Sequence, residues 1–184
     1  MRVLIGCERS GVVRDAFIER GHYAVSCDLQ PSDTAGPHLL VDIFKAMSAE
    51  CWDLIILHPP CTALAVCGNA TYADSEARAS AIDWTRNLFN VACLAAPKVV
   101  MENPVGVLSS QWRKPDQYIQ PWQYGHGETK KTGLWLHNLP CLQPTDIVEG
   151  REGRVWKMSP GPERSRLRGI TYQGIANAMA EQWG

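Results

Sequence analysis

A cysteine that directly follows two prolines is the residue in this sequence whose setting most favours chemistry. Pro59 and Pro60 restrict the backbone, so the side chain of Cys61 is held in one direction. A cysteine held in this way could act as a nucleophile, although a single cysteine is more often buried and inert. Further along, Glu102 begins the tripeptide Glu-Asn-Pro after an apolar run, where burial could keep its carboxyl protonated near neutral pH. Together, the two groups predict covalent catalysis.

Two aspartates and a glycine-containing turn suggest a nucleotide site. Asp28 and Asp42 each follow a short apolar run. There, Asp28 could accept hydrogen bonds from ribose hydroxyls and Asp42 from an adenine amine, although either aspartate could simply turn the chain. In the first turn, Gly6 and Gly11 would let a ligand approach the backbone closely. The turn lacks the Gly-x-Gly-x-x-Gly spacing, which disfavours a dinucleotide pyrophosphate.

The pattern of apolar residues predicts an α/β fold in which a parallel sheet carries these groups. Short apolar runs alternate with helical patterns, which is typical of strands with helices on the sheet faces. We expect strands at 2–5, 23–27, 39–41, 53–57, 98–101 and 133–136, helices at 13–20, 75–96 and 172–183, and a loop at 141–168. Because ligands bind at the carboxyl ends of parallel strands, four side chains should meet at one edge: Asp28, Asp42, Cys61 and Glu102.

Composition is typical of a soluble globular protein, with 45% hydrophobic and 20% charged residues among 184. No apolar run approaches the roughly 20 residues that span a bilayer, and the N-terminus lacks a secretion signal. We therefore expect a cytoplasmic protein without a membrane partner. The seven cysteines form no Cys-x-x-Cys pair, which argues against disulfides and structural zinc.

A net charge of −1 does not indicate a nucleic-acid binder, so any basic footprint must be local. Basic residues do gather late in the chain. They could contact phosphates, or they could form an ordinary solvated surface: Lys130, Lys131, Arg164, Arg166 and Arg168.

The motifs in this order resemble those of the DNA (cytosine-5)-methyltransferase family. Its Pro-Pro-Cys motif matches 59–61, and its Glu-Asn-Val motif appears as Glu-Asn-Pro at 102–104. Its first strand and loop match 3–11, with Phe17 in the following helix, and its Gly-Asn-Ala element matches 174–178 with two extra residues between Gly and Asn. The resemblance runs from Met1 to Trp183. It implies a Rossmann-like methyltransferase fold, with a mostly parallel sheet and helices on both faces.

The chain also departs from that family. The first loop lacks the usual Phe and paired glycines, and the Gln-x-Arg-x-Arg element falls at 129–133, where only Lys131 replaces an arginine. Family enzymes insert a large target-recognition domain, whereas here only a short insertion around 137–171 is available within a single catalytic domain of residues 1–184. The chain is therefore most similar to small phage-type members, and a homodimer or a protein partner would supply sequence recognition.

The resemblance assigns roles to particular residues and implies S-adenosylmethionine as cofactor and double-stranded DNA as partner. A cytosine is flipped out of the duplex, Cys61 attacks its carbon 6, Glu102 hydrogen-bonds the ring, and carbon 5 is methylated; His58 is expected to pack or hydrogen-bond rather than act as a base. No metal is implied. The residues implied for the cofactor are Gly6, Cys7, Glu8, Ser10, Gly11, Asp28, Leu29, Asp42, Ile43, Pro59, Asn177 and Ala178, and those for DNA are Thr62, Lys130, Lys131, Arg164, Arg166 and Arg168.

Three other readings remain open from the sequence. An amino-group methyltransferase would carry Asp or Asn before the two prolines and an aromatic residue after them, but His58 and Cys61 occupy those places. A catalytically inactive or partner-dependent protein could bind DNA or cofactor with the same fold. A metal-dependent hydrolase is the remotest, because the spacing of His58, Cys61 and Cys67 matches no familiar zinc pattern.

Overall fold

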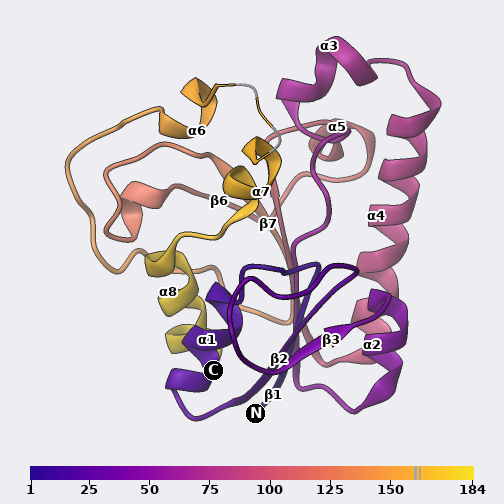
Figure 1. The fold of residues 1–184 in the computed structure, drawn as a ribbon, viewed down its shortest axis with the longest axis vertical. Coiled ribbons are helices and arrows are strands. Elements are labelled where there is room, and N and C mark those ends of the chain that lie inside the picture. The colour runs from indigo at the N-terminus through magenta and orange to yellow at the C-terminus, as the bar shows by residue number, and fades with distance from the viewer. Residues whose placement is uncertain (160, 162) are drawn as a thin grey trace.

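The chain forms a seven-stranded sheet in a computed structural model that describes residues 1–159, 161 and 163–184 (Figure 1). The strand order is β3-β2-β1-β4-β5-β7-β6, with the first five strands parallel and β7 antiparallel to both neighbours. This mostly parallel α/β sheet is compatible with a Rossmann-like fold. The strands are β1 (Arg2–Gly6), β2 (Tyr23–Asp28), β3 (His38–Leu40), β4 (Leu54–Leu57), β5 (Lys98–Pro104), β6 (Gln117–Ile119) and β7 (Thr132–His137).

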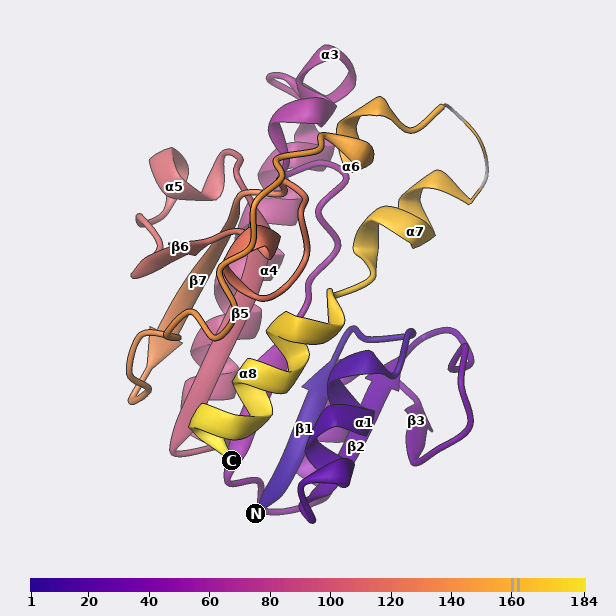
Figure 2. The same cartoon turned by 90° about the vertical axis from the view of Figure 1, so that its left-hand side faces the viewer.

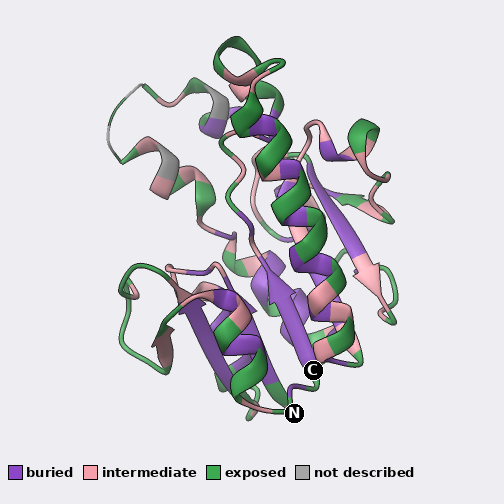
Figure 3. Cartoon of the chain, turned by 90° about the vertical axis from the view of Figure 1, so that its right-hand side faces the viewer, coloured by how far each residue is buried: buried purple, intermediate pink, exposed green. Residues whose placement is uncertain are grey.

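Helices cover both faces of the sheet, as expected (Figures 1 and 2). On one face α1 (Val12–Glu19) packs against α8 (Gln173–Trp183), and on the other α2 (Ile43–Ala49) lies beside α4 (Glu76–Ala95). Side chains alternate along β1, so Val3 and Ile5 join the core under α1 and α8 while Leu4 joins the core under α2 and α4. Figure 3 shows the central strands buried beneath the partly exposed helix α4.

The six predicted strands and three predicted helices are all present, with small differences at their ends. Helix α2 and the edge strand β6 were missed. The buried residues Ile43, Ala46 and Met47 of α2 do have helical spacing, but the segment is short and follows a strand of only three residues. Other short elements are η1 (Val66–Gly68), α3 (Asn69–Tyr72), α5 (Leu108–Gln111) and η2 (Pro121–Gln123).

The loop expected at 141–168 contains two short helices, so that prediction was wrong in part. They are α6 (Arg154–Lys157) and α7 (Arg164–Gly169), which Figure 1 shows near the end of the molecule that also carries α3. Their sequences are rich in arginine and have no long apolar stripe, and such short helices depend on tertiary contacts. Pro160 and Pro162, inside the expected insertion, lie outside the described residues.

The sheet register brings three residues to the same level at its carboxyl edge. Gly6 pairs with Leu57, and Leu57 pairs with Met101, so the next residues along the three strands are Cys7, His58 and Glu102. Because paired residues on neighbouring parallel strands point to the same side, this edge places chemistry-bearing side chains together. Among the residues described, no helix is both long and apolar enough to cross a membrane.

Candidate active site

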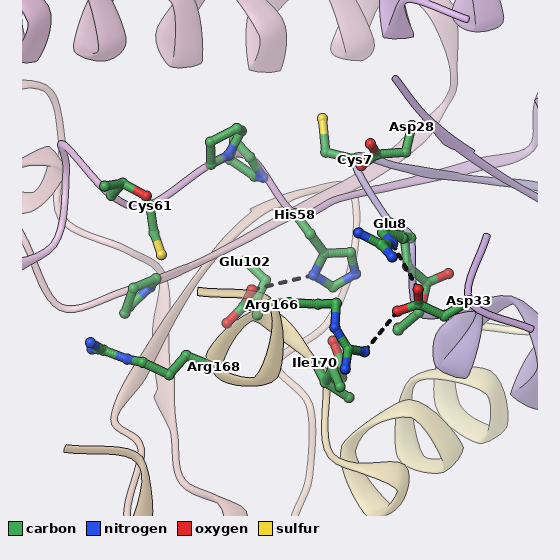
Figure 4. Close-up of a pocket in the computed structure, with 18 of the residues that line it drawn as sticks. Cys7, Glu8, Asp28, Asp33, His58, Cys61, Glu102, Arg166, Arg168 and Ile170 are labelled. Atoms are coloured by element: carbon green, nitrogen blue, oxygen red, sulfur yellow. Dashed lines mark hydrogen bonds and ion pairs between the residues drawn. The ribbon is translucent and has the colours of Figure 1, made fainter. Parts of the chain in front are cut away.

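A cavity of about 450 Å³ lies at the carboxyl edge of the sheet. Its walls come from the turns after β1, β2 and β4, from the end of β5, from Lys130 and Val155, and from the segment 163–171, which we call the strap. In Figure 4 Cys61 lies on one side of the cavity and Asp28 and Asp33 on the other, with His58 and Glu102 between them. The cavity thus has a Cys61 side and an Asp28 side.

Buried backbone contacts fix the turn that carries Cys61. The amide of His58 donates to the carbonyl of Gly6 at 2.9 Å, which ties the start of the turn to β1. The side chain of Asn103, only 1% exposed, donates to the carbonyl of Pro59 at 3.0 Å. Asn103 therefore joins the Pro-Pro-Cys turn to β5, a role that the sequence did not reveal.

The chain after Cys61 is held as firmly as the chain before it. The carbonyl of Cys61 accepts hydrogen bonds from the amides of Leu64 at 3.0 Å and Ala65 at 2.8 Å. The nearly buried guanidinium of Arg78 on α4 donates to the carbonyl of Ala63 at 2.8 Å. A β-carbon on Gly106 would lie 2.0 Å from the carbonyl oxygen of Leu64, so only glycine allows this close approach.

Burial raises the pKa of the Cys61 thiol, and the negative charge of Glu102 raises it further. Lys130 and Arg168 act in the opposite direction. The net direction is upward, so the thiol is protonated near neutral pH. Nucleophilic attack by Cys61 therefore requires that its proton leave as the reaction begins.

Glu102 contacts His58, and this changes its expected protonation state. Burial alone raises the pKa of Glu102, but the hydrogen bond from His58 and the charge of Lys130 outweigh it, with Thr132 adding to their effect, and the pKa falls below its ordinary value. The Nδ1 atom of His58 lies 3.3 Å from Oε2 of Glu102. The expectation that burial keeps this carboxyl protonated was therefore wrong, because its polar neighbours favour the charged form.

Glu8 fills the position at the N-terminus of α1 where an anion would bind. Its Oε1 accepts hydrogen bonds from the amide of Val13 at 2.8 Å and the hydroxyl of Ser10 at 3.1 Å, and its Oε2 accepts from the amide of Arg14 at 3.3 Å. The side chain is nearly buried. A helix N-terminus in this kind of fold often holds a cofactor phosphate. Here the chain's own carboxylate occupies it.

The Asp28 side of the cavity is a loop held in place by a buried arginine. Asp28 accepts a hydrogen bond from the amide of Gln30 at 2.9 Å through one carboxylate oxygen, Oδ1. Arg14 is fully buried and donates to four groups around this loop: the hydroxyls of Ser26, Ser32 and Thr34 and the carbonyl of Ala35. The loop that follows Asp28 therefore has an internal anchor.

Cys7, the other cysteine in the cavity wall, lies in a different environment from Cys61. Its backbone is left-handed, with φ of 57°, which is unusual for a residue other than glycine. Burial, together with the charge of Asp28, raises the pKa of its thiol to about 12. Cys7 is therefore the less reactive of the two thiols that line the cavity.

Several residues implied for the cofactor do not line the cavity. A β-carbon on Gly6 would lie 2.4 Å from Cδ1 of Ile43, and one on Gly11 would lie 2.3 Å from the hydroxyl of Thr34, so protein atoms fill both spaces. Asp42 caps α2 by accepting a hydrogen bond from the amide of Phe44 at 2.9 Å. Leu29 is 74% exposed beside Asp28.

The C-terminal element also differs from the expectation. Asn177 is exposed on α8 and accepts a hydrogen bond from the side chain of Gln173 at 2.8 Å, while Ala178 is buried in the core against α1. Neither lines the cavity. Instead, Ile170 and Thr171, just before α8, are lining residues. Asn177 and Ala178 lie beyond the first turn of α8, which begins at Gln173.

The implied DNA-contacting residues divide into two groups. Lys130, Thr62, Arg166 and Arg168 line the cavity. By contrast, Lys131 and Arg164 lie outside the cavity lining. The ammonium of Lys131 is instead 4.3 Å from the ring centre of Tyr118. Only the first group is placed to contact a ligand in the cavity.

The strap is tied to both sides of the cavity. Arg166 donates to Asp33 at 3.2 Å, and Asp33 also accepts from Arg9 at 2.7 Å. Arg168 donates to the sulfur of Cys67 at 3.2 Å, close to the Cys61 turn. Figure 4 shows Arg166 directed towards Asp33 and Arg168 on the side of Cys61. Asp33 carried no motif signal and was missed.

Comparison of the sequence with models of known protein families found no match, and comparison with curated proteins found no significant match. Within the described residues, no group of three or more His, Cys, Asp or Glu side chains is arranged to hold a metal ion. The inference about function therefore depends on the site itself.

Proposed function

We propose that this protein is a DNA cytosine-5 methyltransferase that uses S-adenosylmethionine and forms a covalent adduct through Cys61. The observation that carries the proposal is that Cys61 and Glu102 line one cavity from the ends of neighbouring strands. Covalent methylation of a cytosine ring needs both groups, since one must bond to carbon 6 and the other must hydrogen-bond the polar edge of the ring.

The Asp28 side of the cavity suits a cofactor without phosphate groups. Glu8 already satisfies the N-terminal amides of α1, so a pyrophosphate there would meet a carboxylate. Only one oxygen of Asp28 has a hydrogen-bond partner among the described residues, which leaves the other able to accept from a ribose hydroxyl. These features fit the nucleoside of S-adenosylmethionine better than a dinucleotide.

The reaction would proceed on the Cys61 side of the cavity. The Cys61 thiol gives its proton to solvent, the resulting thiolate forms a bond to carbon 6 of a flipped-out cytosine, and an electron pair moves from the 5,6 double bond into the ring. Glu102 accepts a hydrogen bond from the exocyclic amine and interacts with the ring nitrogen where negative charge develops. Bound S-adenosylmethionine supplies the methyl group as an electrophile. A water molecule then accepts the carbon 5 proton as the carbon–sulfur bond breaks and the thiolate returns.

Lys130 and Arg168 would support the first step. Both lower the pKa of the Cys61 thiol against the effect of burial. The phosphates of DNA would also approach this basic side of the cavity, and such contacts position a duplex without reading its sequence. Sequence recognition would then come from a second copy of the chain or from another protein.

The decisive test is a covalent trap. Double-stranded DNA containing 5-fluorocytosine should form an adduct with the wild-type protein in the presence of S-adenosylmethionine, because fluorine cannot leave as a proton does. The Cys61→Ser variant should form none, while Cys51→Ser, at an exposed cysteine outside the cavity lining, should behave as the wild type. Mass spectrometry would locate the adduct.

The outcomes separate the proposal from its alternatives. Methylation of ordinary DNA without a trapped adduct would indicate an amino-group methyltransferase. Cofactor binding without transfer on mixed-sequence DNA would indicate a binding protein or a missing partner. Calorimetry with S-adenosylmethionine and with NAD provides an independent check, because the Glu8 arrangement predicts binding of the first and not the second.

A further inference from the structure

The ionised state of Glu102 leaves a proton unaccounted for. When a thiolate adds to cytosine, the ring nitrogen gains negative charge and is best stabilised by a proton. The pKa of Glu102 lies below its ordinary value, so near neutral pH this carboxylate holds no proton to give. A neighbouring group must supply one.

The pairing of β4 with β5 places the side chain of His58 next to that of Glu102. Leu57 and Met101 are paired on β4 and β5, so His58, the first residue after β4, lies level with Glu102 near the end of β5. Nδ1 of His58 lies 3.3 Å from Oε2 of Glu102, and the two side chains are only 8% and 15% exposed. Figure 4 shows the imidazole beside the carboxylate within the cavity lining.

The second ring nitrogen of His58 is buried and has no hydrogen-bond partner among the described residues. A buried imidazole nitrogen without a partner is costly unless a water or a ligand group completes it. Nδ1 of His58 thus contacts Glu102, while Nε2 is left for a water or a ligand group to complete.

We infer that His58 is a positioning residue that holds Glu102 and supplies it with the proton needed by the cytosine ring, an inference that rests on the function proposed above. The imidazolium loses its proton from Nδ1 to Oε2 of Glu102, breaking an N–H bond and forming an O–H bond. The carboxyl oxygen facing the ring passes a proton to the ring nitrogen as Cys61 bonds to carbon 6. Both transfers reverse when Cys61 leaves, so no proton is consumed.

Other charged or titratable groups line the cavity around His58. They come from the turn after β1, the end of β2, β5, the segment before β7 and the strap: Cys7, Glu8, Asp28, Glu102, Lys130 and Arg166. Substitution of His58 itself therefore tests its role more directly than substitution of these neighbouring groups.

The first test measures coupling in the free protein. Nitrogen-15 NMR of labelled histidine, with His58 assigned by its absence from the His58→Asn variant, would follow the imidazole through a pH titration. We expect the Glu102→Gln substitution to change the nitrogen-15 signals of His58 along that titration, because it replaces the carboxylate that Nδ1 contacts. An unchanged titration would overturn the inference without bearing on methyl transfer.

The second test uses the rate of methyl transfer. Asparagine can place its amide nitrogen where Nδ1 of histidine lies, so the His58→Asn variant keeps the hydrogen bond to Glu102 but cannot supply a proton. We expect its rate to be about a hundredfold lower at neutral pH. The matched control, His137→Asn, changes a histidine at the opposite end of the sheet and should leave the rate unchanged.

The pH profile distinguishes proton supply from a structural role. In the wild type, loss of the His58 proton and gain of the Cys61 thiolate offset each other with rising pH, so the rate should be level between the two titrations. In His58→Asn only the gain remains, and the rate should rise with pH. If His58→Asn matches the wild-type rate and profile, the inference fails while the proposed function stands. If the wild type transfers no methyl group at any pH, the proposed function fails.

Discussion

Cys61 stands on the turn after β4 and Glu102 stands within β5, and the sheet fixes both. By contrast, Arg166 and Arg168 stand on a strap whose six-residue helix α7 is held at the surface by an ion pair to Asp33 and a hydrogen bond to Cys67. The first pair is held by the β4–β5 register and by the buried hydrogen bond of Asn103. Buried hydrogen bonds are costly to break, while exposed ion pairs contribute little. The cavity thus has a rigid side, where we propose that the covalent chemistry takes place, and a strap side that is able to adjust to a substrate.

The largest expected effect follows from changing Glu102 on the rigid side. Glu102→Gln should lower the rate of methyl transfer by about 10² to 10⁴-fold, because the amide cannot carry the proton. The same change removes a negative charge that raises the pKa of Cys61. Alkylation of Cys61 by iodoacetamide should therefore become faster at pH 8. A variant that loses both activity and thiol reactivity would indicate a disturbed turn instead.

A smaller effect is expected from Asn103, which carries no chemistry itself. Asn103→Ala removes the hydrogen bond to Pro59 at a buried position. Denaturant unfolding should show a loss of about 1–3 kcal/mol in the free energy of unfolding. Should that free energy stay unchanged, the rigidity attributed to this side of the cavity would have another source.

Lys130 and Lys131 are adjacent lysines whose substitution tests how positive charge in the cavity affects the Cys61 thiol. Lys130 lowers the pKa of the Cys61 thiol, whereas Lys131 lies outside the cavity lining. Lys130→Met should raise that pKa, reduce the thiolate fraction at pH 8, and slow Cys61 alkylation several-fold; Lys131→Met should not. Peptide mass spectrometry distinguishes Cys61 from the other cysteines. Equal slowing by both variants would contradict the placement of Lys130.

The smallest effect on stability should come from the strap. Arg166→Ala breaks ion pairs with Asp33 and Glu163 that are partly exposed to solvent. The free energy of unfolding should fall by much less than in Asn103→Ala, because exposed ion pairs contribute little to stability. A loss as large as that of Asn103→Ala would show that the strap is as firmly built as the strand ends, and the contrast between the two sides would disappear.

The sequence predicted the strand ends well because their signals are local. The strand before Pro-Pro-Cys ends ahead of the prolines, as predicted, whereas Glu-Asn-Pro forms the last three residues of β5 rather than following it. Parallel pairing of β4 and β5 then brings both motifs to one edge of the sheet. The contact between His58 and Glu102 follows from the register in which β4 and β5 pair, and a single sequence does not reveal that register.

The strap and the cofactor side were harder to predict because their contacts are distant in sequence. Arg166 and Asp33 are 133 residues apart, and neither carries a pattern that indicates the other. Gly6 and Gly11 look like ligand-approach positions in the sequence, yet Ile43 and Thr34 fill the space beside them. The charge state of Glu102 also depended on neighbours that only the folded chain supplies.

Glu8 has a practical consequence for work with this protein. Because its carboxylate already accepts hydrogen bonds from the amides at the start of α1, phosphate or sulfate from a buffer has no free amides to bind there. Ligand screens can therefore be run in phosphate buffer without masking this end of the cavity, and an anion that does protect the protein against heating should be sought beside the arginines of the strap.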